Sequence, residues 1–117
     1  MTLVLVDANN VRRSRWPNLD DDELVEQTRQ WAERHGHEVV IVFDRRAPGE
    51  LVGEERLDER TILVGTGGES ADDWLIREAP KHPGAWLVTS DRALRDAASG
   101  AASRVIGGGS FLRELDD

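Results

Sequence analysis

The sequence contains no cysteine among its 117 residues, which excludes disulfides, thiol nucleophiles and zinc sites built from cysteine. It also lacks any apolar run long enough to span a membrane. The first residues lead directly into Leu3–Val6 without a basic region or a leader cleavage site, so we expect a cytoplasmic protein that contacts no membrane. Lysine is almost absent: of the 15 lysine and arginine residues, only Lys81 is a lysine.

Positive charge is scarce relative to negative charge, with 15 basic against 23 acidic residues and a formal net charge of −8. Proteins that coat nucleic acid without specificity are basic, so the balance excludes tight non-specific binding to a polyanion. The 38% hydrophobic content is still sufficient for a folded core. A chain of this length predicts a single domain over residues 1–117, as a monomer or a homodimer.

Five short runs rich in β-branched residues predict the strands of a parallel sheet. Each run is nearly continuous rather than alternating in polarity, as in strands that are covered on both faces. Helical segments lie between the runs, and this alternation predicts a doubly wound α/β sheet with right-handed crossovers. The expected strands are Leu3–Val6, Val39–Phe43, Thr61–Val64, Ala85–Thr89 and a weaker fifth run, Arg104–Ile106.

Four helices are expected between and after these strands. The first follows an acidic run that suits a helix N-terminus and ends before Gly36. The segment Arg45–Arg60 fits either one helical turn or a loop, and Gly107–Gly109 fits a flexible turn. The expected helices are Asp20–His35, Ser70–Ala79, a segment from Ser90 or Asp91 to about residue 99, and Ser110–Leu115.

Acidic residues follow the predicted strands at regular positions. Asp7 and Asp44 come directly after the first and second strands, and Asp91 follows the fourth. Asp72 and Asp73 open the helix that comes after the third strand. Ligands of doubly wound sheets bind beyond the carboxyl ends of the strands, so we expect these acids to meet at the functional edge of the sheet.

Each acid also has an ordinary structural explanation. An aspartate after a strand commonly caps the next helix, which suits Asp91. Asp72 and Asp73 suit the positive end of a helix dipole, and Asp44 suits a turn. Asp7 is followed by Asn9–Val11, where the sequence shows no clear helix to cap. The coincidence of the whole set, rather than any single member, therefore indicates function.

The donor chemistry of this set predicts a hard divalent cation. Carboxylates that are held close together repel one another and stay ionised when a cation lies among them. Oxygen ligands without histidine or cysteine favour Mg²⁺ or Mn²⁺ over zinc. Sites of this kind carry out phosphoryl-transfer chemistry, because the metal activates water and stabilises charge on the phosphate.

Three other classes that use this sheet fit less well. A response-regulator receiver needs an acid pair after the first strand and a lysine after the fifth, whereas Lys81 precedes the fourth strand. A haloacid-dehalogenase phosphatase needs Asp-x-Asp where this chain has Asp7-Ala8-Asn9. A nucleotide-binding fold needs a glycine-rich loop after the first strand, and the glycine run here follows the last one.

Four blocks of sequence carry a family resemblance, and they occur in the order of the family and span nearly the whole chain. Val6–Val11 is similar to V-D-G-Y-N-V, and Val42–Asp44 matches V-F-D. Glu69–Ile76 is similar to a helix opening with T/S-A-D-D, and Val88–Arg92 matches V-T-S-D-R. Together the blocks resemble the NYN-domain ribonucleases of the PIN-like superfamily, in particular the YacP-like branch.

The resemblance implies a three-layer α/β/α sandwich with PIN-like strand order 3-2-1-4-5. It also implies an endoribonuclease that hydrolyses RNA phosphodiester bonds with Mg²⁺ or Mn²⁺. Two departures, Ala8 for glycine and Asn9 for an aromatic residue, bear on substrate choice more than on chemistry. The residues that match family positions are Asp7, Asp72, Asp73 and Asp91 as catalytic and metal-binding acids, and Asn10, Thr89 and Ser90 near the substrate.

Contact with RNA also requires basic side chains near the acids. We predict that Arg12, Arg13, Arg45 and Arg92 bind substrate, since each follows a strand that delivers an acid; ordinary surface charge is the alternative. Trp16 either stacks on a base from an exposed position or packs against the first helix.

Two further functions stay open at this point. The first is a catalytically silent RNA-binding or protein-interaction module on the same fold. The acid set argues against it, because an inactive relative has no reason to keep mutually repelling carboxylates together. The second is a toxin-type PIN nuclease, which would have an antitoxin as its partner.

Overall fold

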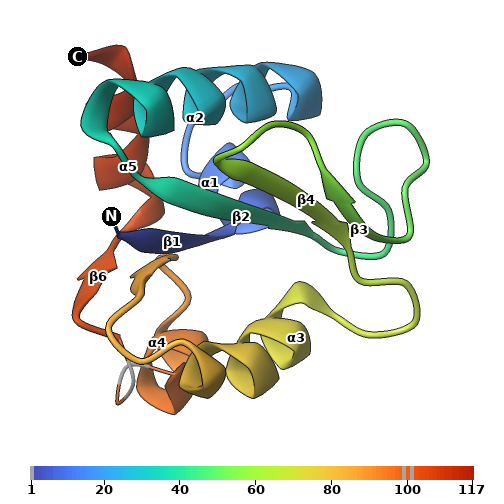
Figure 1. The fold of residues 1–117 in the computed structure, drawn as a ribbon, viewed down its shortest axis with the longest axis vertical. Coiled ribbons are helices and arrows are strands. Elements are labelled where there is room, and N and C mark those ends of the chain that lie inside the picture. Colours follow the sequence, from blue (N-terminus) through green and yellow to red (C-terminus); the bar gives the residue numbers. More distant parts are fainter. Residues whose placement is uncertain (1, 99, 101) are drawn as a thin grey trace.

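The computed structural model describes residues 2–98, 100 and 102–117, and it shows a six-stranded sheet between two layers of helices (Figure 1). The strand order is β3-β4-β2-β1-β5-β6. The strands in chain order are β1 (Leu3–Asp7), β2 (Glu38–Phe43), β3 (Gly53–Arg56), β4 (Thr61–Gly65), β5 (Trp86–Val88) and β6 (Arg104–Ile106).

The five parallel strands have the predicted order and the predicted places in the sequence. β1 lies at the centre, where Val6 pairs with Ile41 of β2 on one side and with Val88 of β5 on the other. Both faces of β1 are covered, and Val4, Leu5 and Val6 are almost completely buried. Continuous β-branched runs are therefore the signature of strands that have no solvent face.

The sixth strand, β3, corrects the expectation of a helical turn or loop within 45–60. It pairs antiparallel with β4 at the edge of the sheet, with Glu55 opposite Leu63. Its sequence, Gly-Glu-Glu-Arg, is exposed at every position. Backbone hydrogen bonds to β4 hold it, and its charged side chains are suited to an edge that must not pair further. The sequence did not predict this strand, because none of its side chains is buried and it therefore has no apolar pattern.

Helices cover both faces of the sheet, as the three-layer prediction requires (Figure 1). One face packs a core containing Val4, Val6 and Ile41 against three helices, and the other packs Leu5 and Val42 against the remaining layer. The first layer consists of α1 (Ala8–Arg13), α2 (Asp21–His35) and α5 (Gly108–Asp116); the second consists of α3 (Ala71–Glu78), a 3₁₀ turn (Ala79–Lys81) and α4 (Arg92–Ala98).

Local signals fixed the ends of the longer helices. Asp20 caps α2 by accepting a hydrogen bond from the Asp22 amide, and Gly36 ends the helix with a φ of 70°. Ser70 caps α3 through the amide of Asp73. These ends agree with the sequence because each depends on one side chain or on the left-handed conformation that glycine adopts easily.

Two helix predictions need correction. α1 was not expected after Asp7, because it has only six residues and no side-chain cap. α5 starts at Gly108 rather than Ser110, so the glycine run is not a flexible turn. A Cβ atom at Gly108 would collide with Ser14 Oγ and crowd Asn10 Oδ1. Glycine is therefore needed there for the close approach of α5 to α1.

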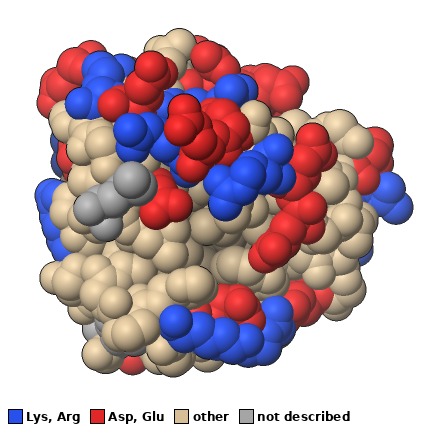
Figure 2. All heavy atoms as spheres, in the orientation of Figure 1, with Lys and Arg blue, Asp and Glu red and all other residues tan. Residues whose placement is uncertain are grey.

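The surface carries charges of both signs. In Figure 2 acidic and basic side chains are intermixed over α2 and along the lower edge, and a wide uncharged area lies between them. The net charge of −8 is thus not a uniform negative field on this face. Within the described part of the chain, no helix combines the length and the apolar character needed to cross a bilayer.

Candidate active site

Asp7 is the last residue of β1, and its carboxylate is buried at the carboxyl end of the central strand. The side chain is only 4% exposed, and Oδ2 accepts a hydrogen bond of 2.9 Å from the Thr89 hydroxyl. Although α1 follows directly, Asp7 makes no capping hydrogen bond with it. At the start of α1 the carboxylate thus has only a weak interaction with the Asn10 backbone amide, and its hydrogen-bond partner is Thr89.

Burial raises the pKa of Asp7 from 3.8 to about 6, because desolvation penalises its charged form. The Thr89 hydroxyl lowers this pKa, the charges of Asp72 and Asp44 raise it, and the Asn10 amide lowers it slightly. No cationic side chain is among the groups that shift it. Asp7 is thus a buried acid whose charged neighbours are other acids.

Thr89 joins Asp7 to Asp91. Its hydroxyl donates to Asp7 and accepts a hydrogen bond of 3.1 Å from the Asp91 amide. Asp91 Oδ1 accepts from the Leu94 amide at 2.9 Å and so caps α4. The capping explanation of Asp91 is correct for this one oxygen. Thr89 is 0% exposed, so the structure makes it a residue that positions the two acids, without direct access to a substrate.

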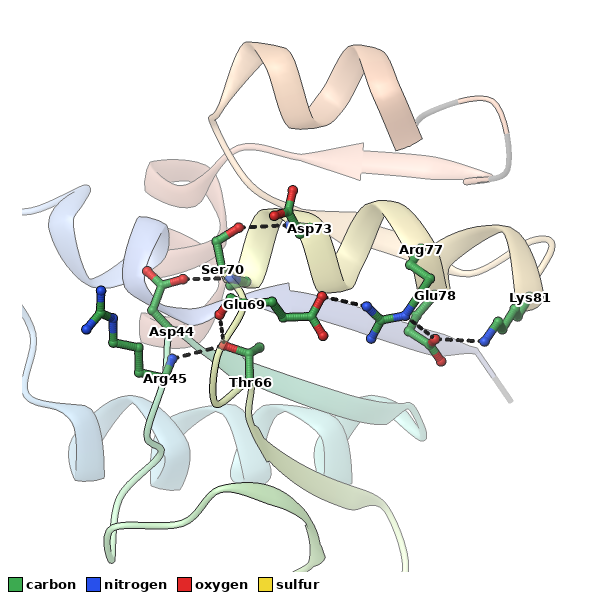
Figure 3. A network of polar contacts seen from close by, with 10 residues as sticks. Asp44, Arg45, Thr66, Glu69, Ser70, Asp73, Arg77, Glu78 and Lys81 are labelled. Carbon is green, nitrogen blue, oxygen red and sulfur yellow. Dashed lines mark hydrogen bonds and ion pairs between the residues drawn. The ribbon is translucent and has the colours of Figure 1, made fainter.

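Asp44 joins the end of β2 to the start of α3. Its Oδ1 accepts a hydrogen bond of 2.6 Å from the Ala71 amide, and its own amide donates to Asn9 Oδ1 at 2.9 Å. Figure 3 shows this carboxylate against the first turn of α3. Since Asp44 acts on the pKa of both Asp7 and Asp72, it belongs to the acidic set. The sequence alone favoured a turn residue there.

Asp72 and Asp73 are distinguished by their surroundings. Desolvation raises the pKa of Asp72, and Asp91, Asp44 and Asp73 raise it further, while Arg13 lowers it. Asp73 is exposed and does not act on the pKa of Asp7. In Figure 3 its carboxylate points away from Asp44. The acids brought together from separate segments are therefore Asp7, Asp44, Asp72 and Asp91, which we call the acidic edge.

Asn10 and Ser90 form a second polar link beside the acidic edge. Asn10 Oδ1 accepts a hydrogen bond of 2.8 Å from the Ser90 amide, and Ser90 Oγ accepts one of 2.7 Å from the Gly108 amide. The contacts tie α1, the end of β5 and the start of α5 together. The sequence did not identify Gly108 as part of this link. Its neighbours in the chain give no sign that the Asn10 side chain packs against it.

The predicted arginines separate into two groups. Arg12 Nε donates to the Leu19 carbonyl at 2.8 Å and lies 2.6 Å from Asp21 Oδ1, so it fastens the connection between α1 and α2. Arg12 therefore already has partners within the protein, and its role in binding substrate stays a prediction. Arg13 is exposed and lowers the pKa of Asp72, so it is the arginine of α1 that faces the acidic edge.

Arg45 and Arg92 lie in two open hollows. Arg45 shares one of about 310 Å³ with Asp44 and Ser70. Arg92 shares the other, of about 400 Å³, with Ser90 and Arg95. Because β1 lies between β2 and β5 in the sheet, these hollows are on opposite sides of Asp7. Acidic residues line both hollows as well, with Glu69 in the first and Asp96 in the second.

The backbone of Arg45 has an unusual conformation that hydrogen bonds stabilise. It has a φ of 63°, which a side-chain-bearing residue seldom adopts. Its amide donates to Thr66 Oγ1 at 2.9 Å, and Thr66 in turn donates to the Glu69 carbonyl (Figure 3). Glu69 pairs with Arg77, which continues through Glu78 to Lys81. The carboxylate of Glu69 is thus paired along α3, although Glu69 lines the same hollow as Asp44.

Comparison with known proteins identifies the family of the chain. The family model of the YacP-like NYN domain matches residues 4–117. The chain belongs to the YacP-like NYN family. NYN domains are a nuclease family, so the chain has a nuclease-type, RNA-related fold.

Solved structures show the same fold. Crystal structures of Rae1 (YacP) from Bacillus subtilis superpose with TM-scores of 0.75 for a W164L mutant and 0.74 for a second structure, both at 23% identity. Each match covers 99% of this chain, and 76% and 74% of the respective Rae1 chains. No curated protein matches by sequence.

The ligand atoms of the acidic edge are of the type that a hard divalent cation prefers. These donors are carboxylate oxygens, and the buried Asp7 has acidic neighbours without a cation to balance them. Among the described residues, no three acidic or histidine side chains are already close enough to hold one ion. A hard cation such as Mg²⁺ is commonly held by one or two carboxylates and by water molecules, which this arrangement of acids allows.

Proposed function

We propose that this YacP-like NYN domain is an endoribonuclease that hydrolyses RNA phosphodiester bonds with Mg²⁺ or Mn²⁺. The observation that supports it best is that acids from three separate segments interact with one another: Asp72 acts on the pKa of the buried Asp7, and Asp91 acts on that of Asp72. Asp44 supports the set by fixing the start of α3. When bound, the cation supplies activation of water and stabilisation of charge on the phosphate.

The residues of the chain have distinct roles in this proposal. Asp7, Asp72 and Asp91 hold the cation, and Asp73 supports them from the exposed side of α3. Thr89 positions Asp7 and Asp91 through its two hydrogen bonds. Asn10 and Ser90 fix the neighbouring backbone, while Arg13, Arg45 and Arg92 bind phosphates of the RNA on either side of the cleavage point.

Incubation of the purified chain with a mixture of end-labelled RNAs tests the proposed function. We expect internal cleavage in Mn²⁺ and none in EDTA, with discrete product ends that can be mapped. A parallel preparation of the Asp7→Asn variant controls for contaminating ribonucleases. If wild type and variant release the same products at the same rate, the proposal is wrong. Binding of RNA without cleavage in Mn²⁺ would instead favour the silent binding module.

Replacement of Thr89 by valine should change the pH dependence of cleavage. The hydroxyl that lowers the pKa of Asp7 is then lost, so the acidic limb of the pH–rate profile moves to higher pH. Asp7 and the Asp91 amide also lose a partner, which costs about 1–3 kcal/mol of stability. Thr89→Ser keeps the hydroxyl and should restore the wild-type profile. An unshifted profile in Thr89→Val would contradict the positioning role.

A further inference from the structure

The most exposed large apolar side chain of the described residues is Trp16, which is 88% exposed. It lies between α1 and α2, in a segment where every residue from 13 to 18 is exposed. The indole therefore does not pack against the first helix. A single exposed apolar residue is common on protein surfaces, so a role for Trp16 depends on what lies around it.

The base of this segment is held rigidly. The Leu19 amide donates to the Arg12 carbonyl at 3.3 Å, and Arg12 Nε donates back to the Leu19 carbonyl at 2.8 Å. Leu19 is buried, and Ser14 Oγ donates to the Asn10 carbonyl at 2.9 Å. These contacts close the loop at its neck. Trp16 is thus presented on a fixed support, which reduces the entropy lost when a ligand stacks on it.

The position of the loop relative to the acidic edge identifies the kind of ligand. α1 begins directly after Asp7 and has six residues, so its far end is roughly 9 Å along the helix axis from the catalytic strand end. Arg13, which acts on Asp72, and Arg15 precede Trp16 in sequence, and both are exposed. An aromatic face with cations beside it suits the stacked bases and phosphates of a single strand.

The geometry points to Trp16 as a stacking platform for an unpaired base, so that the acidic edge acts on single-stranded RNA, with Arg13 and Arg15 on its phosphates. This inference rests on the proposed function and adds a residue outside the acidic edge that binds its substrate. A duplex keeps its bases inside the helix and cannot present one to the indole. The chain therefore selects unpaired segments by a contact that lies outside the acidic edge.

Binding of a labelled oligoribonucleotide to the full chain in EDTA tests this inference without any cleavage. We expect Trp16→Ala to weaken binding of an unpaired strand by roughly 5- to 150-fold, and Trp16→Phe to restore most of it. Binding to a fully paired RNA should be weak in all three proteins and unchanged by the substitutions. In Mn²⁺, Trp16→Ala should raise KM while kcat stays close to wild type.

The two arginines offer a second readout. Joint replacement of Arg13 and Arg15 by alanine should flatten the dependence of log affinity on log salt concentration by about 1.4, since each phosphate contact in a single strand contributes about 0.7. Arg34 at the far end of α2 is exposed and basic. Arg34→Ala is therefore the matched control, and its salt dependence should equal that of wild type.

Failure of this inference can be told apart from failure of the proposed function. If wild type cleaves RNA but Trp16→Ala binds the unpaired strand as tightly as wild type, the stacking platform is wrong and the nuclease stands. The platform is also wrong if Trp16→Ala alters only the oligomeric state in sedimentation, because Trp16 is then a contact between copies of the chain. Loss of unpaired-strand binding in a chain without cleavage keeps the platform and contradicts the nuclease.

Discussion

Asp7→Asn should reduce RNA cleavage by about 100- to 1,000-fold and at the same time stabilise the metal-free protein. The loss follows from removal of the buried charge around which the other acids converge. The amide retains an oxygen that can accept the hydrogen bond from Thr89, so the packing around it is preserved. The measurements are RNA cleavage in Mn²⁺ and thermal unfolding in EDTA.

The stabilisation has a defined dependence on pH. The pKa of Asp7 is raised from 3.8 to about 6 in the folded protein, so the folded state binds a proton more tightly than the unfolded state does. Its contribution to stability is then greatest below pH 3.8 and is lost as the pH rises through about 6. Above that, ionised Asp7 costs on the order of 2–3 kcal/mol.

The variant and wild type should therefore differ most in Tm at pH 7 to 8, and the difference should shrink as the pH falls toward 5. Glu33→Gln removes an exposed acid from α2 and serves as a control, for which we expect little change in Tm at any of these pH values. An Asp7→Asn protein that unfolds at or below the wild-type Tm at pH 7 would contradict the account of a desolvated, unbalanced carboxylate.

The second large effect is expected at Asp72. Asp72→Asn should reduce cleavage by about 100-fold, because Asp72 is the acid of α3 that interacts with Asp7, Asp44 and Asp91. Asp73→Asn is a matched control from the same helical turn. Both variants lose a similar favourable interaction with the helix dipole, about 0.3–1 kcal/mol, so only cleavage should separate them.

The comparison is made on kcat in saturating Mn²⁺, with Tm measured for each protein. Asp73→Asn should lose severalfold at most, since its carboxylate points away from Asp44 (Figure 3). Equal losses in the two variants would show that both carboxylates are needed. A larger loss in Asp73→Asn than in Asp72→Asn would contradict the composition of the acidic edge.

The parallel sheet was predictable because its central strands are buried on both faces and are therefore apolar in sequence. Leu3–Val6 and Val39–Phe43 are apolar throughout, and burial alone selects such runs. β3 was not predictable in this way, because its stability comes from backbone pairing with β4 and its side chains are exposed. α1 escaped detection because it is short and Asp7 makes no cap with it.

The candidate site also has a part that the sequence predicted and a part that it did not. The strand ends that carry Asp7 and Asp91 could be read from the sequence, because parallel strands place their carboxyl ends at one edge. The partners of individual side chains could not. Arg12 is engaged with Asp21, and Asp44 reaches the start of α3, and these contacts depend on how separate segments pack. Membership of the YacP-like NYN family supplies the nuclease-type fold, and the contacts here supply the proposed roles.

Calorimetric titration of the metal-free chain with Mn²⁺ tests the central claim, that the acidic edge is a cation site centred on Asp7. We predict saturable binding to wild type, retained in the Asp73→Asn variant and lost or weakened at least tenfold in Asp7→Asn. The same titration at pH 5 should be weaker, since Asp7 is then mostly protonated. Absence of binding to wild type, or equal binding to wild type and Asp7→Asn, would contradict the claim.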